Sequence, residues 1–139
     1  MSIIADYPSF SSARDHLKDV LDATEDGVSV SVARQGNVSV VLPLDRLRDY
    51  FFRTVSPRIS IFTEKSLTVA LMVDRPFAAE GVDLDSALAD LIVVLREYAA
   101  DWDTRLKDAP NHQQYWALVQ LVKYSTDEQL LEWFESGGE

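Results

Sequence analysis

A change in hydrophobic period across residues 9–52 constrains the fold more than any other feature of the sequence. From Phe10 to Leu21, apolar residues recur every three or four positions, which is the spacing of an amphipathic helix. After Gly27 they alternate with serine, which is the period of a half-buried strand. The stretch therefore predicts a helix, then a β-hairpin, and a second helix after Pro43.

The expected hairpin has two valine-rich strands joined by a glycine-containing turn at residues 35–37. We expect the apolar residues of the two strands to face each other on one side of the hairpin: Val28, Val30 and Val32 opposite Val38, Val40 and Leu42. An isolated hairpin is marginally stable in water. This face must therefore pack on the two helices or on a second copy of the chain.

Polar residues at the first helix and at the hairpin tip are candidates for contacts with phosphate. Ser12 and Asp15 match a capping box, so we expect the helix to begin near Ser11 or Ser12. Such a helix end with Arg14 beside it could hold a phosphate. The hairpin tip adds side chains able to bond phosphates or base edges: Arg34, Gln35 and Asn37. The simpler alternative is an ordinary capped helix and a solvated turn.

The charge of the chain bears on its partners. The formal net charge is −10, which argues against a nucleic-acid partner because phosphate neutralisation needs Lys and Arg. Residues 1–53, however, carry six Lys or Arg against eight acidic residues, whereas residues 54–139 carry seven against fifteen. The acidic second half suits a basic protein partner, or is simply a solvated face.

The absence of cysteine excludes disulfides, thiolate nucleophiles and cysteine-based zinc sites. The first residues lack a basic segment followed by a long apolar run, and the apolar stretches are shorter than a bilayer span. We therefore expect a cytoplasmic protein with no membrane partner.

Four short motifs follow one another in the first 53 residues: Ser9-x-x-x-Ala13-Arg14-x-x-Leu17, a valine-rich strand led by Gly27, Ala33-Arg34-Gln35-Gly36, and Leu44-x-x-Leu47-x-x-Tyr50. Their order and spacing resemble the N-terminal domain of Phd/YefM-type antitoxins. The resemblance implies an α+β homodimer with a helix–hairpin–helix dimerisation module. It also implies that the module binds the operator DNA of its own operon.

In that family the arginine of the first helix and the arginine of the hairpin turn reach DNA, and Arg14 and Arg34 occupy those positions. The expected DNA-binding residues are Ser9, Ser11, Ser12, Arg14, Arg34, Gln35 and Asn37. One difference from the family is the turn, which often has two consecutive basic residues, whereas here Gln35 follows Arg34.

A small polar stretch with a proline at residues 54–58 predicts a linker between a first domain at 1–53 and a second region at 59–139. The second region is expected to contain a β-hairpin of strands 59–62 and 67–73, a loop at 74–81, and three helices. The first of these helices starts at Leu84, with Asp83 or Asp85 as its cap, and has about 20 residues. Ser125 with Glu128, or Thr126 with Gln129, forms the capping box of the last helix.

Part of this second region is similar to HicB-type antitoxins: Asp74-Arg75-Pro76, then Glu80-Gly81-Val82-Asp83-Leu84-Asp85, then a long helix. The two resemblances together imply a toxin–antitoxin pair, with the cognate toxin as protein partner. We expect the apolar helices to hold this partner through Leu91, Leu95, Tyr98, Trp102, Trp133 and Phe134.

No pattern in the sequence indicates an enzyme. His16 and His112 lack ligand-spaced partners, so we expect neither a metal site nor a cofactor. Asp90, Glu97 and Asp101 share one side of a helix, where a solvated polar face is the simpler interpretation. The sequence therefore favours an antitoxin that neutralises its toxin and represses its operon. The alternatives are an interaction adaptor that has lost DNA binding and, more distantly, a metal-dependent nuclease.

Overall fold

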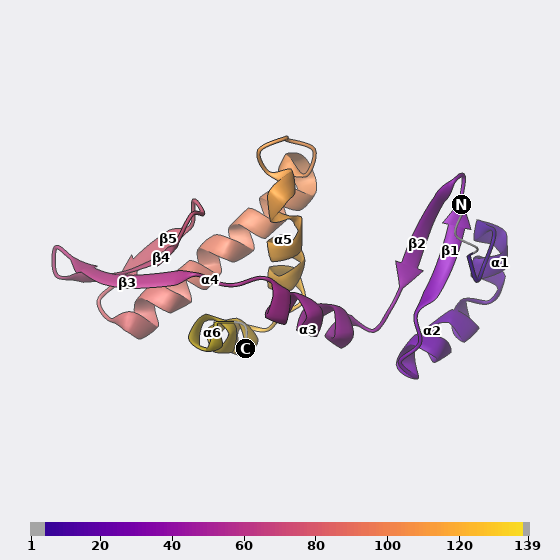
Figure 1. The fold of residues 1–139 in the computed structure, drawn as a ribbon, viewed down its shortest axis with the longest axis horizontal. Coiled ribbons are helices and arrows are strands. Elements are labelled where there is room, and N and C mark those ends of the chain that lie inside the picture. The colour runs from indigo at the N-terminus through magenta and orange to yellow at the C-terminus, as the bar shows by residue number, and fades with distance from the viewer. Residues whose placement is uncertain (1–4, 138–139) are drawn as a thin grey trace. The chain divides into compact units, whose positions relative to one another are not determined.

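The structure of the chain, a computed structural model, describes residues 5–137, and these form six α-helices and two small antiparallel sheets (Figure 1). They divide into two compact units, one on each side of the Leu47–Arg48 bond. The division therefore falls within α3 (Leu44–Thr54), and the expected linker at 54–58 belongs to the second unit. The end of α3 belongs to the second unit because Phe51 is buried there, with its ring 5.5 Å from that of Trp116.

The helix expected at the start of the first unit is interrupted at His16. It forms α1 (Phe10–Asp15) and α2 (Leu17–Glu25). Ser9 is the N-cap of α1, because its Oγ accepts the N–H of Ser12 at 3.1 Å. The helix thus begins at Phe10, one residue before the expected start near Ser11 or Ser12, and its cap is Ser9 in place of Ser12.

The hairpin consists of β1 (Val30–Arg34) and β2 (Asn37–Val41), joined by a turn of only two residues. Gln35 and Gly36 both have positive φ, at 49° and 84°, which is the conformation of a type I′ turn. This turn matches the right-handed twist of the strands and brings Arg34 opposite Asn37. The expected turn of three residues is therefore too long by one.

The shorter turn changes which side chains share a face of the hairpin. Val38 lies opposite Ala33, and Val40 lies opposite Ser31. Directly opposed residues project to the same side of a sheet, so these two valines are on the face away from buried Val30. The expected single apolar face is therefore wrong, because a shift of one residue moves every side chain of a strand to the other side. Val38 and Val40 are 43% and 55% exposed.

The second unit contains an antiparallel sheet in the order β3 (Ile59–Glu64), β4 (Leu67–Met72) and β5 (Ala78–Gly81). Strand β5 replaces the second half of the loop expected at 74–81. Its four residues include no β-branched or aromatic side chain, so the sequence contained no signal for a strand. The first strand, β3, is an edge of this sheet.

Helix α4 (Leu84–Asp101) packs on β4 and β5. Asp83 is its N-cap: its Oδ1 accepts the N–H of Ser86 at 2.8 Å, and this hydrogen bond lowers the pKa of Asp83. The prediction of an acidic cap at Asp83 is confirmed. A side chain on Gly81 would not fit here, because an added Cβ would come within 2.7 Å of the Ala87 nitrogen.

Two further helices, α5 (Trp116–Lys123) and α6 (Asp127–Ser136), complete the second unit. The Thr126–Gln129 capping box at the start of α6 is confirmed. Arg96 of α4 connects to this end of the chain by donating to the Ser125 carbonyl at 2.9 Å and to Asp127 at 2.6 Å. Fully buried side chains from the sheet and the three helices form the core: Met72, Leu91, Leu95, Leu121, Leu130 and Trp133. Within residues 5–137, the helices are all too short or too polar to cross a bilayer.

Candidate nucleic-acid interface

The two arginines that the sequence singled out meet at one aromatic ring. The guanidinium carbon of Arg14 lies 5.8 Å from the centre of the Phe10 ring, and that of Arg34 lies 5.4 Å from it. Phe10 is the first residue of α1, whereas Arg34 is at the end of β1, so the packing of α1 along β1 produces this arrangement (Figure 1). We call these three residues the arginine cluster.

Phe10 holds the two charges close together while leaving them in contact with solvent. Phe10 is 51% exposed, and a cation over an exposed ring gains about 0.5–1 kcal/mol. The sequence identified Phe10 only as an apolar position of a helix. Its role as a platform depends on the approach of α1 to the hairpin tip, which no local pattern indicates.

The charge of the arginine cluster is only partly compensated. Arg14 forms an ion pair with Asp15 at 3.4 Å, and both side chains are mostly exposed, so the pair is weak. Arg34 forms no ion pair with any carboxylate that the structure describes. This corner of an acidic protein therefore presents two arginine side chains with a net positive charge.

The other residues expected to bind DNA surround the arginine cluster in different ways. Gln35 is exposed in the turn, and Asn37 is exposed opposite Arg34. Ser11 is exposed on the first turn of α1, whereas Ser9 and Ser12 are joined by the capping hydrogen bond. Since α1 has only six residues, its dipole contributes little, and the arginines supply most of the positive charge.

The residues expected to hold a protein partner lie mostly in the core. Five of the six are buried: Leu91, Leu95, Trp102, Trp133 and Phe134. The sixth, Tyr98, is partly buried; its hydroxyl forms a hydrogen bond of 2.6 Å with His112 Nδ1, and burial raises the pKa of Tyr98. In the structure these are positions of the core of the second unit, where α4 contacts β4, β5, α5 and α6.

Strand β3 carries two of the exposed large apolar side chains of the second unit. Ile61 is 45% and Phe62 is 42% exposed, although both belong to a strand of the sheet. The sequence predicted a strand here and did not indicate which of its side chains are exposed. Ile61 and Phe62 are consecutive and therefore project to opposite faces of the sheet, so both faces of β3 are exposed at this point.

The carboxylates of α4 are not arranged as a metal site. Within residues 5–137, no group of three or more His, Asp or Glu side chains could hold a metal ion. Asp101 instead accepts from Arg105 at 3.4 Å, one helical turn away.

No protein-family model matches this chain, and no curated protein matches its sequence. One solved structure does share its fold: a crystal structure from Syntrophomonas wolfei subsp. wolfei, described as an antitoxin part of a proposed toxin/antitoxin system. The two structures superpose with a TM-score of 0.78 over 92% of this chain and 95% of that chain, at 14% sequence identity. At this identity the likeness establishes a common fold.

Proposed function

We propose that this protein is the antitoxin of a toxin–antitoxin pair, which binds a cognate protein toxin through its second unit and operator DNA through its first. The observation that carries the proposal is the arginine cluster, in which two arginines distant in sequence converge on Phe10. The fold shared with the Syntrophomonas wolfei structure, described as an antitoxin part, supports the same function.

The arginine cluster suits a DNA backbone or a base edge. Guanidinium groups bind phosphate oxygens and guanine edges through paired N–H donors. The exposed amides of Gln35 and Asn37 at the hairpin tip add donors and acceptors beside Arg34. The negative net charge of the chain repels DNA at long range, where salt screens it. The arginine contacts act at short range and are screened less.

We also propose that DNA binding requires a homodimer formed through the outer face of the hairpin. Val38 and Val40 are exposed there, and a two-stranded hairpin gains stability when its apolar face is covered. A second copy would cover this face and bring two arginine clusters to one DNA site. Dimeric DNA-binding proteins contact two half-sites of their DNA in this manner.

Substituting Val40→Glu is therefore expected to convert a dimer into a monomer at micromolar concentration, measured by analytical ultracentrifugation. The cause is burial of an unpaired carboxylate in the dimer interface, while the exposed site in the monomer tolerates the charge. Ser39→Glu, on the other face of the same strand, is the matched control and should remain dimeric. A dimer that persists in Val40→Glu would contradict the proposed interface.

For the toxin, we propose strand β3 as the docking element in place of the buried residues. An edge strand has free backbone N–H and C=O groups that a partner strand can pair with, and its exposed side chains provide selectivity. Ile61 and Phe62 would supply those side chains. The excess of acidic residues in the second half suits a basic partner.

Co-expression with the small protein encoded by the neighbouring gene tests this function. We expect the chain to copurify with that protein and to restore growth of cells that produce it. Phe62→Glu should weaken the complex about tenfold or more, because an interface side chain would become an unpaired charge. Val93→Glu changes a valine on α4 that is 50% exposed, and it should leave the complex unchanged. Failure of the wild-type chain both to copurify and to restore growth would refute the proposal.

A further inference from the structure

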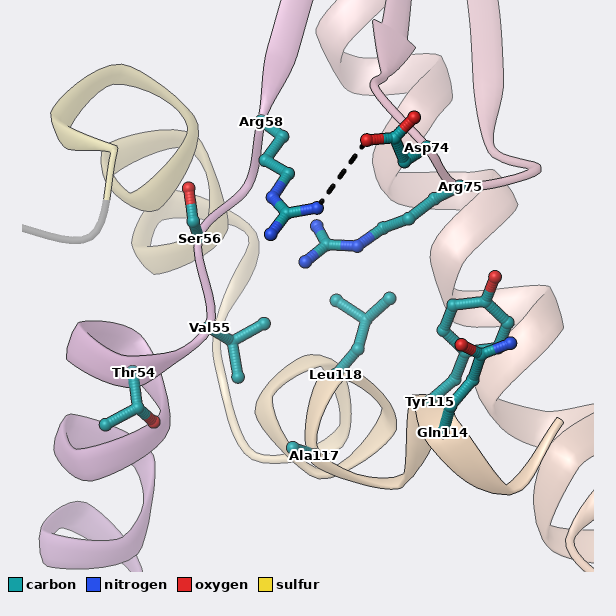
Figure 2. Close-up of a pocket in the computed structure, with 10 residues that line it drawn as sticks. All are labelled: Thr54, Val55, Ser56, Arg58, Asp74, Arg75, Gln114, Tyr115, Ala117 and Leu118. Carbon is teal, nitrogen blue, oxygen red and sulfur yellow. Dashed lines mark ion pairs between the residues drawn. The ribbon is translucent and has the colours of Figure 1, made fainter.

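A pocket in the second unit has no role in DNA or toxin binding as proposed above. It has a volume of about 360 Å³ and lies between the start of β3, the β4–β5 connection and the start of α5 (Figure 2). Arg58, Asp74 and Arg75 line one side, and Tyr115 and Leu118 line the other. This volume is at the lower end of the range of small-molecule sites.

Two guanidinium groups lie beside each other in this pocket. Figure 2 shows the side chains of Arg58 and Arg75 turned toward its centre with their guanidinium groups adjacent. The nearest counter-charge is Asp74, whose Oδ2 is 3.9 Å from Nη1 of Arg58, a distance at the limit of an ion pair. Arg75 donates to the carbonyl oxygen of Pro57 at 3.3 Å, which leaves most of its five N–H donors for other partners.

The surroundings disfavour this arrangement of charges. Burial, and then the positive charge of Arg58, hold the pKa of Arg75 below its ordinary value. Asp74 supplies a single, mostly exposed carboxylate, which can compensate at most one of the two positive charges. An anion placed between the two guanidinium groups would offset their repulsion and accept from their remaining N–H donors.

The backbone at the pocket is strained at the residues that carry the charges. Arg58 and Asp74 have φ angles of 51° and 63°, in the left-handed region that costs a non-glycine residue about 1 kcal/mol or more. The hydrogen bond from the Val73 N–H to the Arg58 carbonyl, at 2.7 Å, holds the two strained residues side by side. Strain of this kind gathers where the chain must aim side chains at a ligand.

We propose that this pocket binds the oxyanion of a small molecule, a phosphoryl or carboxylate group, between the guanidinium groups of Arg58 and Arg75. The phenol of Tyr115 and the side chain of Leu118 form the wall against which the rest of the ligand packs. The site is built from the second unit alone, so the proposal is independent of the antitoxin function.

Titration calorimetry on the full chain tests the proposal, with inorganic phosphate and citrate as probes and chloride at matched ionic strength as the reference. We expect saturable binding of at least one probe beyond the chloride reference. Tighter binding of phosphate would identify a phosphoryl ligand, and tighter binding of citrate a carboxylate ligand. Absence of saturable binding for both probes would overturn the proposal.

Two variants are expected to change the affinity for the anion probes in opposite directions. Arg75→Gln should weaken binding about tenfold or more, since a charge-assisted bidentate contact is lost. Asp74→Asn should strengthen binding several-fold, because it removes the competing carboxylate while asparagine accepts the positive φ. A site without an anion role would not gain affinity from the second change, so weaker or unchanged binding by Asp74→Asn would refute it.

The control is Arg105→Gln, which removes an exposed arginine that pairs with Asp101 and does not line the pocket. It should bind the probes as tightly as the wild-type chain. Equal loss of binding in Arg105→Gln and Arg75→Gln would indicate general charge attraction and would also overturn the proposal.

Discussion

The double variant Arg14→Ala/Arg34→Ala is expected to bind the DNA upstream of its own coding sequence at least about a thousandfold more weakly than the wild-type chain, or not at all. Each arginine of a DNA interface contributes about 1–3 kcal/mol, and a dimer loses four of them. The two side chains act on the same DNA segment because they converge on Phe10. Electrophoretic mobility shift and fluorescence anisotropy, each at several salt concentrations, would measure the change.

The salt dependence distinguishes loss of phosphate contacts from loss of folding. The wild-type affinity should fall linearly with the logarithm of salt concentration, and the variant should have a shallower slope. Lys18→Ala is the matched control, because Lys18 is an exposed cation of the same unit that pairs with Asp22 and lies outside the arginine cluster. Its affinity should change little.

If the wild-type chain produces no shift even at low salt, the repressor part of the proposed function fails. The alternative from the sequence, an adaptor of this fold that does not bind DNA, would then account for the acidic net charge and for Gln35 in the turn. Binding to a toxin through β3 is independent of this result. The copurification experiment would therefore still decide the antitoxin role.

Replacing Trp133 with alanine is expected to lower the free energy of unfolding of the second unit by about 3–5 kcal/mol, which is the usual cost of truncating a buried tryptophan. Trp133 is fully buried, and its ring lies 5.6 Å from that of Phe134. Its Nε1–H donates to the Val55 carbonyl at 2.7 Å and so connects α6 to the segment after α3. Urea denaturation followed by circular dichroism measures the loss.

Trp133→Phe separates the hydrogen bond from the packing. It keeps most of the apolar volume but leaves the Val55 carbonyl without its donor, at an expected cost of about 1–3 kcal/mol. Trp116→Ala is the second control, because this tryptophan is 48% exposed and should cost less than Trp133→Ala. Equal losses for the two alanine variants would contradict the central position assigned to Trp133.

Much of the secondary structure follows from interactions between residues close in sequence. Asp83 caps α4, and Thr126 with Gln129 caps α6, as expected, because each cap joins groups only three residues apart. The helical pattern likewise located α4, which has 18 residues where about 20 were expected. Identifying Arg14 and Arg34 as candidates needed only the residue types and the resemblance to a family.

Tertiary structure decided what local patterns leave open. The apolar positions of α4 have the same spacing whether they face a core or a partner, so the sequence could not tell that Leu91 and Leu95 are buried. Strand β5 forms because β4 offers it a partner, although its own residues favour no strand. The oxyanion pocket depends on strained residues 16 positions apart that no sequence motif connects.

The hairpin of the first unit shows what the local sequence determines and what tertiary contacts decide. The alternating valines and Gly36 were sufficient to predict two strands and a turn, because strand period and turn conformation are local properties. The length of the turn, and with it the face on which Val38 and Val40 lie, depended on pairing across the strands. The meeting of Arg14 and Arg34 at Phe10 depended on packing of α1 against that hairpin, which only contacts between distant residues determine.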